Sequence, residues 1–588
     1  MRKTKLNDVT PAKAGVQSEK LDSRWSLSRT RCGAGMTNTF SAIGTVYYFS
    51  IVTFQCFLVL SFRTMMSAKI VNISVVLILI VLSLAILANS MAKPIGRDEQ
   101  MYCTGGALLA QGKMIYRDFS YAAQLPYHPL LCAALFRTFS TTHYLLVGRI
   151  LSAFCDILVL VCIVGIYRYI FKSFAISGML LGLAAAVLYV FNPLVDYANG
   201  YAWNHDVVIL CVVLSFWLFI STDFKQKSPA EGGHDQNPAS LGWRIAAIGA
   251  LLTFASCMRI TTALVELLFF VMLLSQPAES IKQRFKTALP FLAAIAFVLI
   301  WPVWVIAQAP RAFFLNLVKI PTLYGEWLHE IGMVYNKSAL TLTCLRQPGY
   351  FALVVLAIYL CLVVVCLRRR LNISNVRALL LAALLPLAFF IIALIPPTMW
   401  RQYLATPVPF LVISFALPLL YLRKLAGKTS VSKHFKIAAA LVIVCALVAV
   451  AYYPVVLYRT PLVLVPERWV PIEIHKISED IAQRTKEPKL ILTLAPLLAL
   501  EGGSDIYTEL SCGAIIYRAA DSMSPSERSV THTVGPKTLG ELLEKSPPSA
   551  VILGVEMRRL EGPIFESIVK PDWERKVYEN GLIVYFRP

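Results

Sequence analysis

Long apolar runs separated by short polar segments organise most of the chain between residues 70 and 457. A helix needs about 20 predominantly apolar residues to cross a lipid bilayer, and most of these runs approach or exceed that length. We therefore predict a polytopic α-helical membrane protein with about eleven membrane spans, at residues 70–92, 144–170, 174–192, 206–221, 243–258, 260–275, 287–308, 349–367, 376–396, 403–422 and 436–457.

The two ends of the chain depart from this pattern. A further apolar run at 40–62 would place the basic segment 1–31 on the outer side of the membrane, against the usual charge rule. We expect the biological start at Met65 or Met66 and treat 1–64 as a doubtful extension, a leader segment being the alternative. From residue 458 charged residues return, with strand-like runs at 490–494 and 550–553 and a hairpin signal at Asn580-Gly581. We predict a transmembrane module over 65–457 and a small α/β domain over 458–588.

Charge adds an orientation to this picture. Only 15% of the 588 residues are charged and 57% are hydrophobic, whereas about a quarter of the residues in soluble domains are charged. The net charge of +21 comes mainly from basic residues in alternate loops, which indicates a cytoplasmic position for those loops and not nucleic-acid binding. Segment 93–143 and the C-terminal domain then lie outside.

The 13 cysteines include no CxxC pair, so no cysteine zinc site or disulfide framework is indicated.

An acidic pair, Asp98-Glu99, directly follows the first predicted span. Ionisable groups near lipid are costly and are therefore candidates for a functional site, although a solvated loop is the simpler interpretation. The pair opens a predicted helix over 98–111, whose Gly105-Gly106 step favours packing against a neighbour. The polar and aromatic residues that follow, up to 129, predict a helix-loop-helix at the membrane surface.

Further polar residues lie on the same predicted side. Asp206, with His205 beside it, opens the fourth span, where a simple helix cap is the alternative. Arg259 lies in the tight turn between the fifth and sixth spans, where it either faces a polar cavity or extends to the interface. Arg401 and Tyr403 precede the tenth span, and Lys319 lies in the long outer loop 309–347.

The pattern DE…ALL.GK..YRDF…P..P after the first span resembles the GT-C membrane glycosyltransferases, which include protein O-mannosyltransferases and the lipid A aminoarabinose transferase. Arg149 at the start of the second span, Arg401-Gln402-Tyr403 and the terminal outer α/β domain extend the resemblance over most of the chain from Met65. The resemblance implies a bacterial inner-membrane enzyme. Its donor would be a polyprenyl-phosphate-linked sugar, transferred with inversion to an acceptor on a glycan, lipid or protein.

The chemistry of such a transfer assigns roles to these residues. An acceptor hydroxyl needs a carboxylate to take its proton, for which Asp98 is the candidate, with Glu99 as an orienting or metal-binding partner. The departing lipid phosphate needs positive charge or hydrogen-bond donors, for which the candidates are Arg259, Arg401, Tyr403 and Lys319.

The remaining assignments are less specific. Asp206 and His205 are candidates for sugar binding, or for holding a divalent metal ion together with Asp98, although we assemble no full set of ligands. Tyr116, Arg117 and Asp118 would support the outer loop, with an internal Arg117-Asp118 ion pair as the alternative. No cofactor is certain. The competing functions are a transporter or flippase of lipid-linked sugars, which should show repeat symmetry, and a non-catalytic envelope-glycan assembly protein.

Overall fold

The computed structural model describes residues 68–222, 238–276, 280–333, 336–367, 375–396, 398–425 and 432–588. The doubtful extension 1–64 and the run at 40–62 lie outside the described residues, and so do the basic residues 368–370 between the predicted eighth and ninth spans. The expectations about the start site and the twelfth span therefore stay predictions.

Apolar helices occupy every predicted span position. Within the described segments, eight helices are long and apolar enough to cross a membrane, and shorter apolar helices cover 205–221, 240–256 and 260–274. The polytopic helical class is confirmed, whereas the number of spans stays a prediction. The helices at these positions are α3 (Ala68–Ala92), α6 (Tyr144–Ile170), α7 (Ala175–Val190), α9 (His205–Ser221), α10 (Pro238–Ser256), α11 (Ala263–Leu274), α12 (Ile281–Gln308), α16 (Pro348–Leu367), α17 (Val376–Leu394), α18 (Pro407–Ser414), α19 (Ala416–Leu425) and α20 (Ser432–Tyr452).

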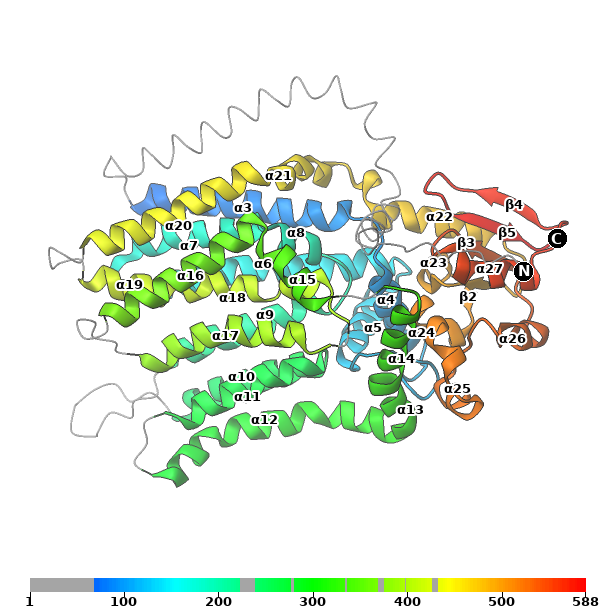
Figure 1. The fold of residues 1–588 in the computed structure, drawn as a ribbon, viewed down its shortest axis with the longest axis horizontal. Coiled ribbons are helices and arrows are strands. Elements are labelled where there is room, and N and C mark those ends of the chain that lie inside the picture. The colour runs from blue at the N-terminus through cyan, green and yellow to red at the C-terminus, as the bar shows by residue number, and fades with distance from the viewer. Residues whose placement is uncertain are drawn as a thin grey trace, which may run out of the picture.

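These helices run side by side along the long axis of the molecule, and the C-terminal region lies at one end of the bundle (Figure 1). Shorter helices fill the layer between the two parts, as α4, α5 and α14 show in Figure 1. The shorter helices of the first 460 residues are α4 (Arg97–Ala110), α5 (Tyr127–Phe139), α8 (Pro193–Ala198), α13 (Pro310–Phe314), α14 (Ile320–Glu330), α15 (Lys337–Leu345) and α21 (Val455–Arg459).

The C-terminal region forms a five-stranded mixed sheet in the order β2-β1-β3-β5-β4. Its strands are β1 (Leu490–Thr493), β2 (Asp505–Ile506), β3 (Ala550–Leu553), β4 (Glu574–Val577) and β5 (Ile583–Phe586), and its helices are α22 (Val470–Arg484), α23 (Pro496–Glu501), α24 (Ala514–Ala519), α25 (Pro525–Thr531), α26 (Leu539–Lys545) and α27 (Arg558–Ile568). Strand β1 pairs in parallel with β2 and β3, and β5 pairs antiparallel with β3 and β4. The two predicted buried strands and the hairpin are therefore confirmed.

A continuous apolar core joins the C-terminal region to the segment after the first span. Buried side chains of α4 and α5, such as Leu108 and Phe136, belong to the same cluster as Leu498 of α23 and Ile552 of β3. The packing of α4 against both α5 and α23 fixes the acidic pair at the boundary between the helix bundle and the C-terminal region.

Asp480 of α22 illustrates how the C-terminal region holds its helices on the sheet. Although partial burial raises the pKa of Asp480, hydrogen bonds from Lys576, Tyr578 and Arg484 lower it to about 2. The ionised carboxylate thus links α22 to strand β4 and the turn that follows it.

Candidate active site

Helix α4 presents the acidic pair in its first turn. The backbone N–H of Gly96, which caps the helix, donates to Glu99 Oε2 at 2.7 Å. Farther along, the two adjacent glycines lie against neighbouring side chains: a Cβ on Gly106 would come within 2.6 Å of Cys132 Cβ, and one on Gly105 within 2.9 Å of the Tyr121 ring. The expectation that this glycine step packs closely against a neighbour is confirmed.

Glu99 is completely buried and its carboxylate is fully occupied. Arg149, equally buried, donates from Nε to Oε1 and from Nη2 to Oε2, both at 2.8 Å. The N–H of Ala202 donates to Oε1 at 2.7 Å, which adds to the bond from Gly96. The remaining Arg149 donors reach the carbonyls of the 90–94 segment at 2.7–3.0 Å. The Glu99–Arg149 pair therefore fixes the positions of the backbone segments that hydrogen-bond to it.

Asp98, the adjacent acid, has the opposite environment. Its side chain is half-buried, and among the residues that the structure describes no donor makes a hydrogen bond or ion pair with its carboxylate. Burial raises the pKa of Asp98, and the positive charges of Arg97 and Arg259 lower it. An accessible carboxylate with a raised pKa is a suitable general base.

Three side chains from different elements gather beside Asp98. The Arg259 guanidinium, at the turn between α10 and α11, lies 6.0 Å from the centre of the Tyr403 ring. Tyr102 of α4 lies within electrostatic reach of both Asp98 and Arg259, and so does Tyr403. The structure thus brings Asp98, Arg259 and Tyr403, three of the predicted site residues, into one group.

His205 and Asp206 lie at the start of α9, and both are almost completely buried. Asp206 Oδ2 accepts from the N–H of Gly200 at 2.8 Å, but in the described part of the chain its Oδ1 and both ring nitrogens of His205 have no hydrogen-bond partner. Both residues lie within electrostatic reach of Arg259. These two donors fall short of the three ligands typical of a catalytic metal site. In the described part of the chain, neither Asp206 nor Asp98 belongs to a group of three potential ligands.

Two predicted phosphate ligands lie outside the group around Asp98. Lys319, at the end of a π-helical segment (Leu315–Lys319), forms an ion pair of 2.5 Å with Glu527 of α25. Arg401 begins the short helix Arg401–Leu404, and its charge lies near the thiol of Cys344 on α15. Lys319 is therefore engaged by the C-terminal region, while Arg401 stays a candidate at a different point.

The predicted loop-support residues have structural contacts. Arg117 forms a bidentate pair with Asp118, two bonds of 2.8 Å, and Asp118 also accepts from the N–H of Met114. Tyr116 is buried with a positive φ of 66° and donates from its hydroxyl to the carbonyl of Gln124. This pairing corresponds to the internal ion pair that we kept as the alternative.

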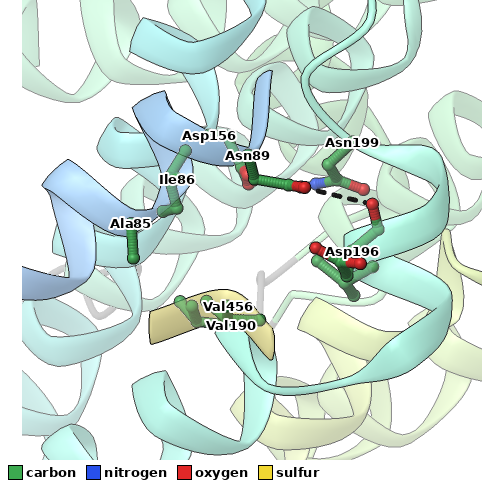
Figure 2. A pocket seen from close by; sticks show the side chains of 9 residues that line it. Ala85, Ile86, Asn89, Asp156, Val190, Asp196, Asn199 and Val456 are labelled. Carbon is green, nitrogen blue, oxygen red and sulfur yellow. Dashed lines mark hydrogen bonds between the residues drawn. The ribbon is translucent and has the colours of Figure 1, made fainter. Parts of the chain in front are cut away.

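A buried polar network beneath the site was missed by the sequence analysis. Asp196, on α8, accepts from Arg459 at 3.0 Å and from Tyr453 at 2.7 Å, and its carbonyl accepts from Asn89. Asn89 and Asp196 line a small pocket, together with Asp156 of α6 (Figure 2). An acid inside a predicted span was the available signal, since such residues are rare and usually functional. The network fixes the segment 193–204 that leads to Asp206.

The C-terminal region also approaches the acidic pair. Arg97, next to Asp98, pairs with Glu556 at 3.1 Å, and Glu556 pairs with the buried Arg518 at 2.6 Å. Arg518 lies over the rings of Tyr324 and Trp327 on α14. A pocket between the start of α4 and α24 is lined by Arg97, Gln100, Gly513, Arg518 and Glu556, among others. Sequence reasoning had no signal for this contact between distant segments.

Comparison with solved structures identifies the architecture. ArnT from Cupriavidus metallidurans bound to undecaprenyl phosphate superposes with a TM-score of 0.55 at 14% identity, over 88% of this chain and 98% of that chain. Its apo state gives 0.53 at 15% identity, over 87% and 97%. The chain has a GT-C fold. The GT-C-like multi-pass membrane fold that the resemblance implied is thus confirmed.

Other comparisons add little to the GT-C assignment. The apo oligosaccharyltransferase of Archaeoglobus fulgidus matches at 12% identity with a TM-score of 0.47, over 82% of this chain and 69% of that chain. No family model and no curated protein sequence matches the chain. At these identities the similarity establishes the GT-C fold and assigns no activity.

Proposed function

We propose that this protein transfers a sugar from a polyprenyl-phosphate-linked donor to an acceptor hydroxyl, with inversion at the sugar carbon. The observation that carries the proposal is the contrast within the acidic pair: the Asp98 carboxylate is half-buried and has no partner among the described residues, whereas Glu99 is buried and held by Arg149. The GT-C fold supports the general kind of reaction, because ArnT with the same fold was solved with undecaprenyl phosphate. We place the reaction at the outer face of a bacterial inner membrane, beneath the C-terminal domain.

Asp98 acts as the general base in this proposal. It takes the proton of the acceptor hydroxyl while the hydroxyl oxygen forms a bond to the anomeric carbon of the sugar. The bond from that carbon to the phosphate oxygen breaks on the opposite face, and the electron pair leaves with the lipid phosphate. The raised pKa of Asp98 makes it a stronger base than an ordinary aspartate.

Arg259 stabilises the negative charge that develops on the leaving phosphate. The charge of its guanidinium acts on Asp98, Tyr102 and Tyr403 together. Tyr403 offers a hydroxyl donor to the same oxygen atoms, and Arg401 offers a second guanidinium at the start of the same short helix. Preorganised donors of this kind supply a large share of the rate enhancement in many enzymes.

Glu99 and Arg149 are positioning residues, because they hold the first turn of α4 and segment 90–94 against each other. Asp206 Oδ1 and the His205 nitrogens, buried and without partners, are the candidate sugar-binding groups. With only two donors at that point, we derive no step through a metal ion.

The decisive experiment follows consumption of polyprenyl-phosphate sugars by the purified protein in lipid. Wild type, Asp98→Asn and the matched control Asp572→Asn, an exposed aspartate of the C-terminal region, are compared with several donors. We expect turnover by wild type and control and a loss of about 10²- to 10⁴-fold in Asp98→Asn, the range typical of general-base catalysis. Equal turnover by all three proteins would exclude Asp98 as the base, and no turnover by any would favour transport.

A further inference from the structure

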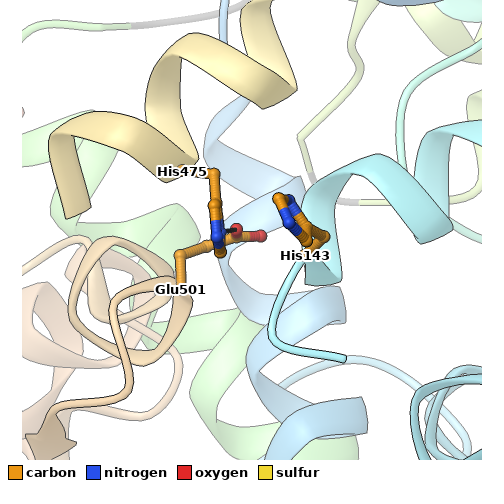
Figure 3. Close-up of side chains that lie close together, drawn as sticks. All are labelled: His143, His475 and Glu501. Carbon is orange, nitrogen blue, oxygen red and sulfur yellow. Dashed lines mark hydrogen bonds and ion pairs between the residues drawn. The ribbon is translucent and has the colours of Figure 1, made fainter. Parts of the chain in front are cut away.

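A second group of side chains lies where the helix bundle meets the C-terminal region. His143 precedes α6, His475 lies on α22, and Glu501 ends α23. The three side chains converge from these separate elements (Figure 3). One potential ligand atom from each residue lies within 4.8 Å of the others, and this is the group of three that stands out among the described residues.

We propose that His143, His475 and Glu501 bind a first-row divalent cation, of which Zn²⁺ is the best fit, and that this metal links the C-terminal domain to the helix bundle. Two imidazoles and one carboxylate are a ligand set that zinc commonly takes. The site is separate from the proposed sugar-transfer chemistry and does not depend on it.

Glu501 is held in an orientation suited to a ligand. The N–H of Leu145 donates to its Oε1 at 2.6 Å, which leaves Oε2 facing His475 Nδ1 at 2.8 Å. The side chain is almost completely buried. A metal ion would take the place of the proton in this Nδ1–H···Oε2 contact, so no other hydrogen bond of Glu501 is lost.

His475 has the outer partner that metal-bound histidines usually have. Its second ring nitrogen, Nε2, lies 3.3 Å from Glu479 Oε1. Ligating histidines typically donate the other ring N–H to a carboxylate, which fixes the tautomer and the orientation of the ring. Glu479, one turn along α22, provides this contact.

His143 supplies the third ligand, and its ring carries a buried nitrogen that is available to bind a metal ion. Its Nδ1 is buried and has no hydrogen-bond partner among the described residues, which carries a cost for a polar atom. The ring stacks on that of His475 with a centroid separation of 3.5 Å and an angle of 28°. Ligand atoms around a tetrahedral zinc ion are about 3.3 Å apart, given bonds of about 2.0 Å, so metal binding requires the two stacked rings to turn until a nitrogen of each faces the ion.

Metal titration of the full-length protein tests this site. Chelator-treated protein in lipid is titrated with Zn²⁺ against a chromophoric competitor. Wild type is compared with the site variants His143→Phe and His475→Gln. The control is His434→Gln, which alters an exposed histidine near the start of α20. His143→Phe keeps an aromatic ring on the stack and removes no hydrogen bond that the structure shows to Nδ1, so this variant should fold.

We expect one Zn²⁺ bound by wild type and control, with an affinity lower by more than about 100-fold in both site variants, because even indirect partners of ligands are worth 10- to 100-fold. Zn²⁺ should also raise the thermal stability of wild type and control but not that of His143→Phe. Absence of Zn²⁺ binding by wild type, or unchanged binding by the two site variants, would overturn the proposal. Sugar transfer is measured separately on the metal-free protein. The result tests the proposed function alone, so a failure of one proposal can be told from a failure of the other.

Discussion

The two adjacent acids of α4 should respond in opposite ways to the same chemical change. We predict that Glu99→Gln destabilises the protein strongly, whereas Asp98→Asn leaves stability nearly unchanged and abolishes sugar transfer. The physical reason is their environment, since Glu99 accepts four hydrogen bonds in a fully buried position and Asp98 accepts none among the described residues.

The magnitude follows from the atoms involved. Each oxygen of Glu99 accepts one Arg149 N–H and one backbone N–H. A glutamine side chain replaces one of these oxygens by an NH₂ group, which cannot accept a hydrogen bond. The two N–H groups that now donate to that oxygen would then lose their acceptor. Removing one partner of a buried ion pair typically costs about 3–5 kcal/mol, which shifts the folding equilibrium by about 100-fold or more.

Reversible unfolding in mixed micelles, followed by tryptophan fluorescence, measures this loss for Glu99→Gln, Asp98→Asn and Asp572→Asn. The double variant Glu99→Gln/Arg149→Gln should lose less than the sum of its single variants, because both single changes remove the same interaction. The reasoning is refuted if Glu99→Gln is as stable as Asp572→Asn, or if Asp98→Asn is as unstable as Glu99→Gln.

Four further predictions concern separate features. Sugar transfer should fall as pH decreases through the pKa of Asp98, and because burial raises that pKa the acid limb of the pH–rate profile should lie above about pH 4; an acid limb at or below that value would contradict it. Arg259→Ala should lower kcat/KM for the lipid donor about 10- to 100-fold, the value of a hydrogen bond to a charged group, and Arg259→Lys should recover part of the loss in the same steady-state assay. Gly106→Ala should lower Tm, because its Cβ would lie 2.6 Å from a side chain of α5 and overpacking costs about 1–3 kcal/mol; Gly540→Ala, with open space around its Cβ, should instead leave Tm unchanged or raise it. The pKa of Asp480 is lowered to about 2, so its contribution to stability is present above about pH 4 and is lost as pH falls toward 2; Asp480→Asn should flatten that part of the stability–pH curve, and an unaltered curve would exclude the contribution.

The elements of the fold were predictable because their signals are local. Apolar length placed helices such as α3 and α6, and the Asn580-Gly581 turn placed the β4–β5 hairpin. The predicted start of α4 is only one residue late, because its acidic first turn is visible in a few consecutive residues, although Gly96 and not Asp98 caps the helix. Apolar length was a poorer guide to the number of spans, because helices such as α11 are only 12 residues long.

The roles of the site residues depend on ion pairs and hydrogen bonds between residues far apart in the sequence. Such contacts leave no local sequence signal. Arg149 lies 50 residues from Glu99, and Lys319 lies 208 residues from Glu527. The sequence analysis named Asp98 as the base and kept Lys319 beside Arg259 among the phosphate-ligand candidates, but no local pattern showed that Arg149 holds Glu99 or that Glu527 holds Lys319.

The same argument explains why the histidine–glutamate group was invisible to motif reasoning. Metal motifs that can be read from sequence place their ligands a few residues apart on one element, whereas His143, His475 and Glu501 come from a loop and two helices of different regions. Such a site forms only when the C-terminal domain is docked on the helix bundle. Metal binding there would therefore favour the docked arrangement by mass action, in addition to the apolar core that α4 and α23 already share.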